Sequence, residues 1–95
     1  PDLVTLVGVL SACSQVGSLK TGRSVHCYML RRHVLDRVAA TAVMDMYSKC
    51  GVLARSREIF EKIGKKDLVC WNTMISCYGI HGKGEEVISL FIKMT

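Results

Sequence analysis

Residues 42–60, AVMDMYSKCGVLARSREIF, decide the fold because two short apolar patterns lie on either side of one glycine. In each pattern the apolar residues follow helical spacing, which places them on one side of an α-helix. Gly51 can end the first helix as a C-cap because it has no Cβ to penalise a left-handed backbone. The stretch therefore predicts two helices joined at Gly51, which form a helical hairpin. Its apolar positions are Val43, Met44, Tyr47, Ile59 and Phe60.

The same hairpin recurs around three glycines. Gly17, Gly51 and Gly82 lie 34 and then 31 residues apart (51 − 17; 82 − 51). Apolar residues recur at matching distances from them: Leu10, Met44 and Ile75 seven before; Val25, Ile59 and Leu90 eight after; Met29, Ile63 and Met94 twelve after. A repeat of this length that cannot bury its apolar face alone is typical of a solenoid. The sequence predicts an all-α protein, an α-solenoid of about three tandem helix-turn-helix hairpins.

The spacing also predicts the boundaries. We expect repeats over residues 1–36, 37–67 and 68–95, with the last one truncated because the chain ends early. The first helices are expected over 3–16, 37–49 and 68–80, and the second over about 18–32, 52–63 and 83–95. Asp2 or Thr5 is the candidate N-cap of the first helix, and Ser18, Asp36 and Asp67 are candidate N-caps of later ones. Gly64 is expected to be left-handed in a polar turn, and Gly22 to allow close approach of two helices. Because the chain opens at Pro1 without methionine, we interpret it as part of a longer array.

Composition narrows the function classes without choosing one. The formal charge of +5 and the pI near 9.1 are compatible with a polyanionic partner, but also with neutral ones. Charged residues interrupt every apolar run, so we expect no transmembrane helix. The five cysteines are odd in number and contain no C-x-x-C pair, which favours reduced thiols over disulfides or zinc ligands.

Two segments carry a family resemblance, MDMYSKCG at residues 44–51 and CWNTMISCYGIHGKGEEVISLF at residues 70–91. They resemble pentatricopeptide repeats, and the three copies look like the long, short and standard variants that alternate in plant organellar proteins. The resemblance implies a right-handed superhelix whose first helices line a groove for single-stranded RNA, with one base per repeat. It further implies a mitochondrial or chloroplast location and a parent protein that specifies sites of cytidine-to-uridine RNA editing.

The resemblance also assigns roles to residues. The copies are counted from Leu3, Arg37 and Leu68, because Pro1-Asp2 looks like the tail of a preceding repeat. The second residue of each copy, an aliphatic that sandwiches a base, is Val4, Val38 or Val69. The fifth and last residues choose the base: Thr41 with Asp67 favours guanine, Asn72 suits a pyrimidine, and Val7 with Asp36 discriminates weakly. Lys49 matches a position that often contacts phosphate, although its counterparts Gln15 and Ile80 are not basic.

Each assignment has a plainer structural alternative. The valines could pack neighbouring hairpins, the aspartates could serve only as N-caps, Thr41 could be an ordinary helix residue, and Asn72 could bond to a turn. His26 is expected in the core, Trp71 is expected to pack rather than stack on a base, and His81 lies at a helix C-terminus.

We expect no catalytic site, metal or cofactor, since the H-x-E and C-x-x-C patterns of zinc deaminases are missing. The expected partners are single-stranded RNA and editing-complex proteins. The main alternative is a helical-repeat scaffold for protein–protein interaction, and a metal-dependent enzyme is the weakest reading. Self-association through the exposed ends of the solenoid is also expected.

Overall fold

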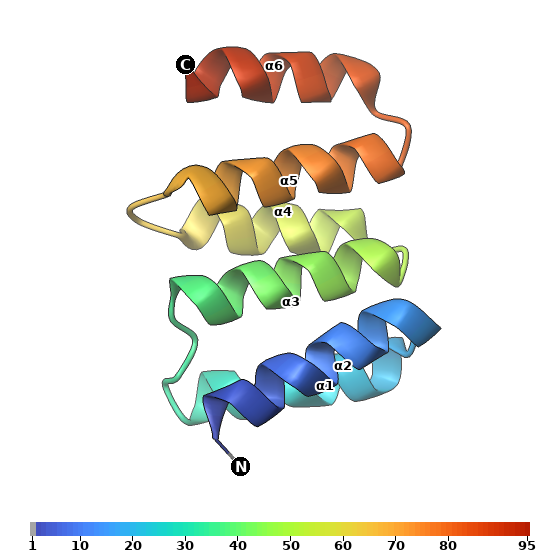
Figure 1. The fold of residues 1–95 in the computed structure, drawn as a ribbon, viewed down its shortest axis with the longest axis vertical. Helices are drawn as coiled ribbons and strands as arrows, with labels where there is room; N and C mark the ends of the chain where they lie inside the picture. Colours follow the sequence, from blue (N-terminus) through green and yellow to red (C-terminus); the bar gives the residue numbers. More distant parts are fainter. Residues whose placement is uncertain (1) are drawn as a thin grey trace.

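The computed structural model describes residues 2–95; Pro1, where the first expected repeat begins, lies outside them. The chain forms three stacked hairpins that rise from the N-terminus to the C-terminus (Figure 1). Central helix α3 packs against α1 and α5 as well as against α2 and α4, so the middle hairpin is covered on both sides. The prediction of an all-α solenoid is confirmed. Its helices are α1 (Leu3–Val16), α2 (Leu19–Arg31), α3 (Arg37–Lys49), α4 (Leu53–Lys62), α5 (Leu68–Ile80) and α6 (Gly84–Met94).

The three hinge glycines make the hairpin turns. Gly17, Gly51 and Gly82 have φ of 72°, 87° and 69°, in the left-handed region that other residues avoid. Gly64 does not share this conformation, so the prediction for it is wrong: the turn before α5 closes with negative φ angles.

Aspartate caps begin the first helix of every hairpin. The carboxylates of Asp2, Asp36 and Asp67 accept from the backbone N–H three residues on, at 2.8, 2.8 and 2.9 Å. The second helices have no such cap, and the expected cap at Ser18 is wrong because its side chain makes no bond to the helix. A side-chain N-cap therefore stabilises the start of each first helix, whereas the second helices depend on packing against their neighbours.

The core consists of buried side chains from both sets of helices. Leu10, Met44 and Met74 are fully buried on the first helices, and Met29 and Phe60 are buried on the second. A Cβ on Gly22 would overlap the side chain of Met46 and lie 2.8 Å from its Cγ, which confirms a close approach of α2 to α3. In the next hairpin the same position is Ser56, whose buried hydroxyl donates to the carbonyl of Met44 at 2.6 Å.

Polar side chains in and beside the core find specific partners. His26 is 8% exposed, as expected for a core histidine, and its Nδ1 lies 2.9 Å from the hydroxyl of Tyr47. Burial lowers the pKa of His26, and the nearby cations of Arg55 and Lys62 lower it further. Trp71 packs edge-on against Phe60, with the two ring centroids 5.1 Å apart, which confirms its packing role.

The thiols are not all structural. Cys13, Cys70 and Cys77 are buried, but Cys27 is exposed, and Cys50 reaches only the carbonyl of Cys13 at 3.8 Å. Burial raises the pKa of the Cys50, Cys70 and Cys77 thiols, which favours their uncharged form.

The last helix leaves apolar side chains in solvent. Ile88, Phe91 and Ile92 on α6 are 63%, 54% and 65% exposed. A further hairpin stacked on α6 would cover them, as α5 covers α3.

Candidate nucleic-acid interface

The first helices of the three hairpins share one shallow hollow of about 430 Å³. Each of these helices contributes to it, so the hollow crosses all three repeats. The mixture of aliphatic, hydroxyl and amide groups offers apolar contact together with hydrogen-bonding groups of both kinds. Its lining residues are Val7, Val38, Thr41, Ala42, Asp45, Val69, Asn72, Thr73 and Ser76.

The predicted base-sandwiching valines are exposed rather than packed. Val4, Val38 and Val69 are 81%, 66% and 58% exposed, although each lies on a helix that has a buried side. Val38 and Val69 line the hollow, whereas Val4 lies outside it. These exposures do not fit the alternative that the valines pack neighbouring hairpins, and they leave an aliphatic side chain available to a partner from each repeat.

Two of the predicted base-choosing residues face the same space. Thr41 and Asn72 line the hollow from α3 and α5. The Thr41 hydroxyl donates to the carbonyl of Val38 at 2.8 Å, which leaves its oxygen free to accept. The Asn72 amide is exposed and has no hydrogen bond to any described residue, so the expected alternative bond to a turn is not formed.

The two aspartates at the repeat ends cap helices and differ in their other contacts. The carboxylate of Asp36 accepts only from the amide of Ala39 among the described residues. Asp67 accepts from the amide of Cys70 and also pairs with Arg37, whose Nε lies 3.2 Å from its second oxygen. The Cys70 amide lowers the pKa of Asp67, and Arg37 adds to this effect. Val7 lines the hollow and is half-buried, so the first repeat presents an apolar group there.

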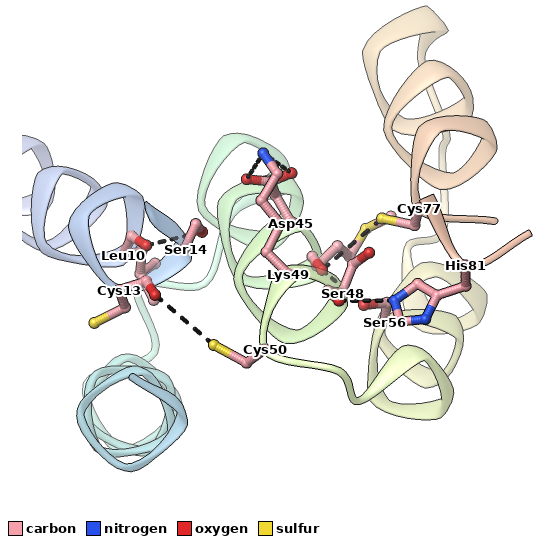
Figure 2. A network of polar contacts seen from close by, with 11 residues as sticks. Leu10, Cys13, Ser14, Asp45, Ser48, Lys49, Cys50, Ser56, Cys77 and His81 are labelled. Atoms are coloured by element: carbon pink, nitrogen blue, oxygen red, sulfur yellow. Dashed lines mark hydrogen bonds and ion pairs between the residues drawn. The ribbon is translucent and has the colours of Figure 1, made fainter. Parts of the chain in front are cut away.

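Lys49 is held by an acid of its own helix. Its Nζ lies 3.1 and 3.2 Å from the two carboxylate oxygens of Asp45, one turn earlier (Figure 2). Asp45 lines the hollow, whereas Lys49 does not. The equivalents of Asp45 are Ser11 and Ser76, so the middle repeat alone places a carboxylate at this position.

The middle hairpin is further fixed at its other end. Figure 2 shows the imidazole of His81, after α5, reaching back to α3, where its Nε2 bonds the carbonyl of Ser48 at 2.7 Å. This contact joins the hinge of the third hairpin to the second and sets the spacing between α3 and α5.

A larger hollow of about 630 Å³ lies between α2 and α4, over α3. Its walls combine Leu30 and Ile59 with the cations of Arg55, Lys62 and Lys65. Of the predicted site residues it includes only Asp36 and Val38. Size alone therefore does not locate the predicted interface, which is the smaller hollow on the first helices.

Residues 2–95 contain neither a metal-binding cluster nor a membrane-spanning helix. No group of three or more His, Cys, Asp or Glu side chains is arranged to hold a metal ion. Within the same residues, no helix combines the length and apolar character needed to cross a membrane.

Two important residues were not singled out from the sequence. Arg37 contacts Asp67 across 30 positions of chain (67 − 37), which no local pattern could reveal. Asp45 stands four residues before Lys49, and this spacing of opposite charges was a visible signal.

Stacked hairpins define the chain as an α-helical repeat protein, and the hollow on its first helices is shallow and open rather than enclosed. The particular family follows from comparison with known sequences. The family model described as PPR repeat matches residues 38–68 and 69–95, and the chain belongs to the pentatricopeptide repeat family. Its matches start at Val38 and Val69; the boundaries expected after residues 36 and 67 stay a prediction.

Relatives in Arabidopsis thaliana agree with this assignment. A pentatricopeptide repeat-containing protein named as mitochondrial is 83% identical over 100% of this chain and 16% of its own length. Another, named as chloroplastic, is 47% identical over 99% of this chain and 21% of its own length. A third is 44% identical over 99% of this chain and 14% of its own length. This chain thus spans between about one seventh and one fifth of these relatives.

Members of this family are in general RNA-binding proteins of organelles.

Proposed function

We propose that the chain binds single-stranded RNA in a mitochondrion or chloroplast, reading one base per repeat. The observation that carries the proposal is the hollow shared by α1, α3 and α5, because Val7, Thr41 and Asn72 line it at equivalent positions. A surface that presents one polar or apolar choice per repeat suits a single strand with splayed bases.

The chemistry of each position supports a division of labour. The exposed valines offer aliphatic contact to the face of any base, which is independent of sequence. In the middle repeat, Thr41 and Asp67 supply oxygen acceptors for the N–H donors of guanine. In the third repeat the Asn72 amide can both donate and accept, which suits a pyrimidine. The first repeat, with Val7, would contribute spacing and contact with little base choice.

We further propose that the parent protein uses this segment to select sites for cytidine-to-uridine editing. The segment would supply recognition, and a deaminase with its own zinc ligands would supply the chemistry, together with other proteins of the editing complex. Names of relatives that refer to the mitochondrion and the chloroplast support an organellar location without choosing between the two.

The test is fluorescence anisotropy with the chain flanked by constant pentatricopeptide repeats, which cover the exposed apolar side chains of α6. The base opposite the middle repeat is varied through all four identities. We expect guanine to bind best, by about tenfold over the weakest base, and affinity to fall as salt rises. Equal binding of all four bases, or no salt dependence, would contradict base reading and favour a protein partner on this surface.

A further inference from the structure

Arg37 contacts the carboxylate of Asp67, the last residue of the middle repeat. Arg37 opens α3 and reaches across the turn between α4 and α5. Its Nε lies 3.2 Å from Oδ2 of Asp67, and its Nη1 donates to the carbonyl of Lys65 at 3.2 Å. The planar guanidinium thereby holds a side chain and the backbone of the same turn at once.

The Asp67 carboxylate is consequently fixed at both oxygens. Oδ1 accepts from the amide of Cys70 at 2.9 Å, and Oδ2 faces Arg37. A carboxylate has about four acceptor directions, so these two contacts leave others open to a ligand. The same turn is braced a second time, because Lys66 donates to the carbonyl of Ile63 at 2.7 Å.

We propose that Arg37 is a specificity-determining positioning residue for base recognition by Asp67. It acts in two ways: it holds the carboxylate in one orientation, and it offsets a negative charge that would repel the RNA backbone. The inference rests on the proposed function, since it concerns how Asp67 meets a base.

The other copies show that this arrangement is not a general feature of the repeat. The residues equivalent to Arg37 are Leu3 and Leu68, neither of which has a charge or a hydrogen-bond donor. The carboxylate of Asp36, the aspartate equivalent to Asp67, makes only the helix-capping bond to Ala39 among the described residues, and no ion pair with them. The cap therefore does not require the arginine, and the arginine has a role beyond starting α5.

The experiment substitutes Arg37→Leu, the residue that the other two copies have, and measures the four-base anisotropy series in the flanked chain. We expect the preference for guanine over the weakest base to fall about threefold or more, the size of coupling seen between contacting residues. Arg37→Lys keeps the charge but lacks the fork, so it should restore part of the preference. Arg55→Leu is the matched control: it removes an exposed arginine that pairs with Glu58, not with Asp67. It should lower affinity for all bases without changing their order.

The outcomes separate this inference from the proposed function. Suppose that the unsubstituted chain prefers guanine. If Arg37→Leu keeps that preference, or lowers the affinity for all four bases equally, Arg37 does not position Asp67. If the parent chain shows no preference, the base-reading function itself fails and the inference fails with it. A second measurement needs no RNA: NMR titration of the Asp67 carboxyl should show a higher pKa in Arg37→Leu, and an unchanged pKa would contradict the contact.

Discussion

The hairpin α1–α2 and the hairpin α3–α4 have the same backbone plan but hold equivalent positions by different chemistry. Where the first has Gly22 against the side chain of Met46, the second has Ser56 bonded to a carbonyl. Where the first has His26 bonded to Tyr47, the second has Phe60 packed on Trp71.

The largest difference lies among the residues that are proposed to choose a base. In the second hairpin Asp67 is held by Arg37, and Thr41 presents a hydroxyl to the hollow. In the first, Asp36 has only its helix cap and Val7 presents no hydrogen-bonding group. The comparison teaches that different side chains at equivalent positions can hold the same stack of hairpins. The proposed base recognition, in contrast, depends on the few positions where the copies differ in hydrogen-bonding groups.

The largest effect on stability is expected where the first hairpin is tightest. Gly22→Val should cost about 2–3 kcal/mol in free energy of unfolding, because its side chain must displace Met46. Urea denaturation followed by circular dichroism measures this. Gly8→Ala is the control: its Cβ would meet nothing within 4 Å, so it should stabilise α1 by about 0.5–1 kcal/mol. Equal effects at the two glycines would show that packing around Gly22 is not limiting.

The second prediction transfers the recognition chemistry from one hairpin to the other. Val7→Thr gives the first repeat, which ends with the acid Asp36, the hydroxyl that the second has at Thr41. We expect the base facing that repeat to become guanine-selective by several-fold, less than the tenfold of the middle repeat, because Leu3 cannot hold Asp36 as Arg37 holds Asp67. Anisotropy with four bases at that position measures it. A preference for a pyrimidine, or none, would show that the pair of residues is insufficient.

A third prediction concerns the ion pair between Lys49 and Asp45. Only the second hairpin has this pair, and its acid lines the hollow. Asp45→Ser, the residue of the other two copies, frees Lys49 and removes a carboxylate from the interface. We expect affinity for every RNA to rise about twofold to fivefold and the salt dependence to steepen, because one more cation can meet a phosphate. A change in base order instead would place Asp45 among the residues that read bases.

The fourth prediction uses pH to separate the two core arrangements. Since the pKa of His26 is lowered in the folded chain, the unfolded chain binds more protons as pH falls below about 6.5. Stability is therefore full above that pH and declines as pH falls through the lower, folded pKa. His26→Phe, which copies Phe60, should flatten the decline between pH 7 and 5, although at pH 7 it leaves the Tyr47 hydroxyl without its partner. A decline that is equally steep in His26→Phe and in the unsubstituted chain would contradict a lowered pKa of His26 in the fold.

The smallest effect is expected in acid at Asp67. Its folded pKa lies below the usual 3.8, so the stability it contributes is complete above that pH and is lost as pH falls through the folded value. Asp67→Asn should reduce the steepness of acid unfolding below about pH 4 relative to the unsubstituted chain. Thermal melts at pH 3 to 6 measure this, and identical curves for Asp67→Asn and the parent chain would contradict a folded carboxylate held by Cys70 and Arg37.

Periodicity was sufficient to predict most of the fold. The glycine hinges, the three aspartate caps and the buried His26 all follow from spacing, because local backbone rules and a repeated apolar pattern determine them. The expectations at Ser18 and Gly64 failed because several backbone solutions can start a helix or close a turn, and tertiary packing selects among them. The exposure of the valines, the contact of Arg37 with Asp67 and the hold of Asp45 on Lys49 depend on side-chain geometry that sequence spacing leaves open.

The central claim is that the middle repeat reads a base through Thr41. The most direct test is the substitution Thr41→Asn, which gives that repeat the residue at the equivalent position of the third, in the flanked chain, with guanine or uracil opposite the middle repeat. We predict that the parent chain binds the guanine RNA more tightly and that Thr41→Asn reverses the order in favour of uracil. If both proteins bind the two RNAs with the same ratio of affinities, Thr41 does not read the base and the proposed recognition mechanism is wrong.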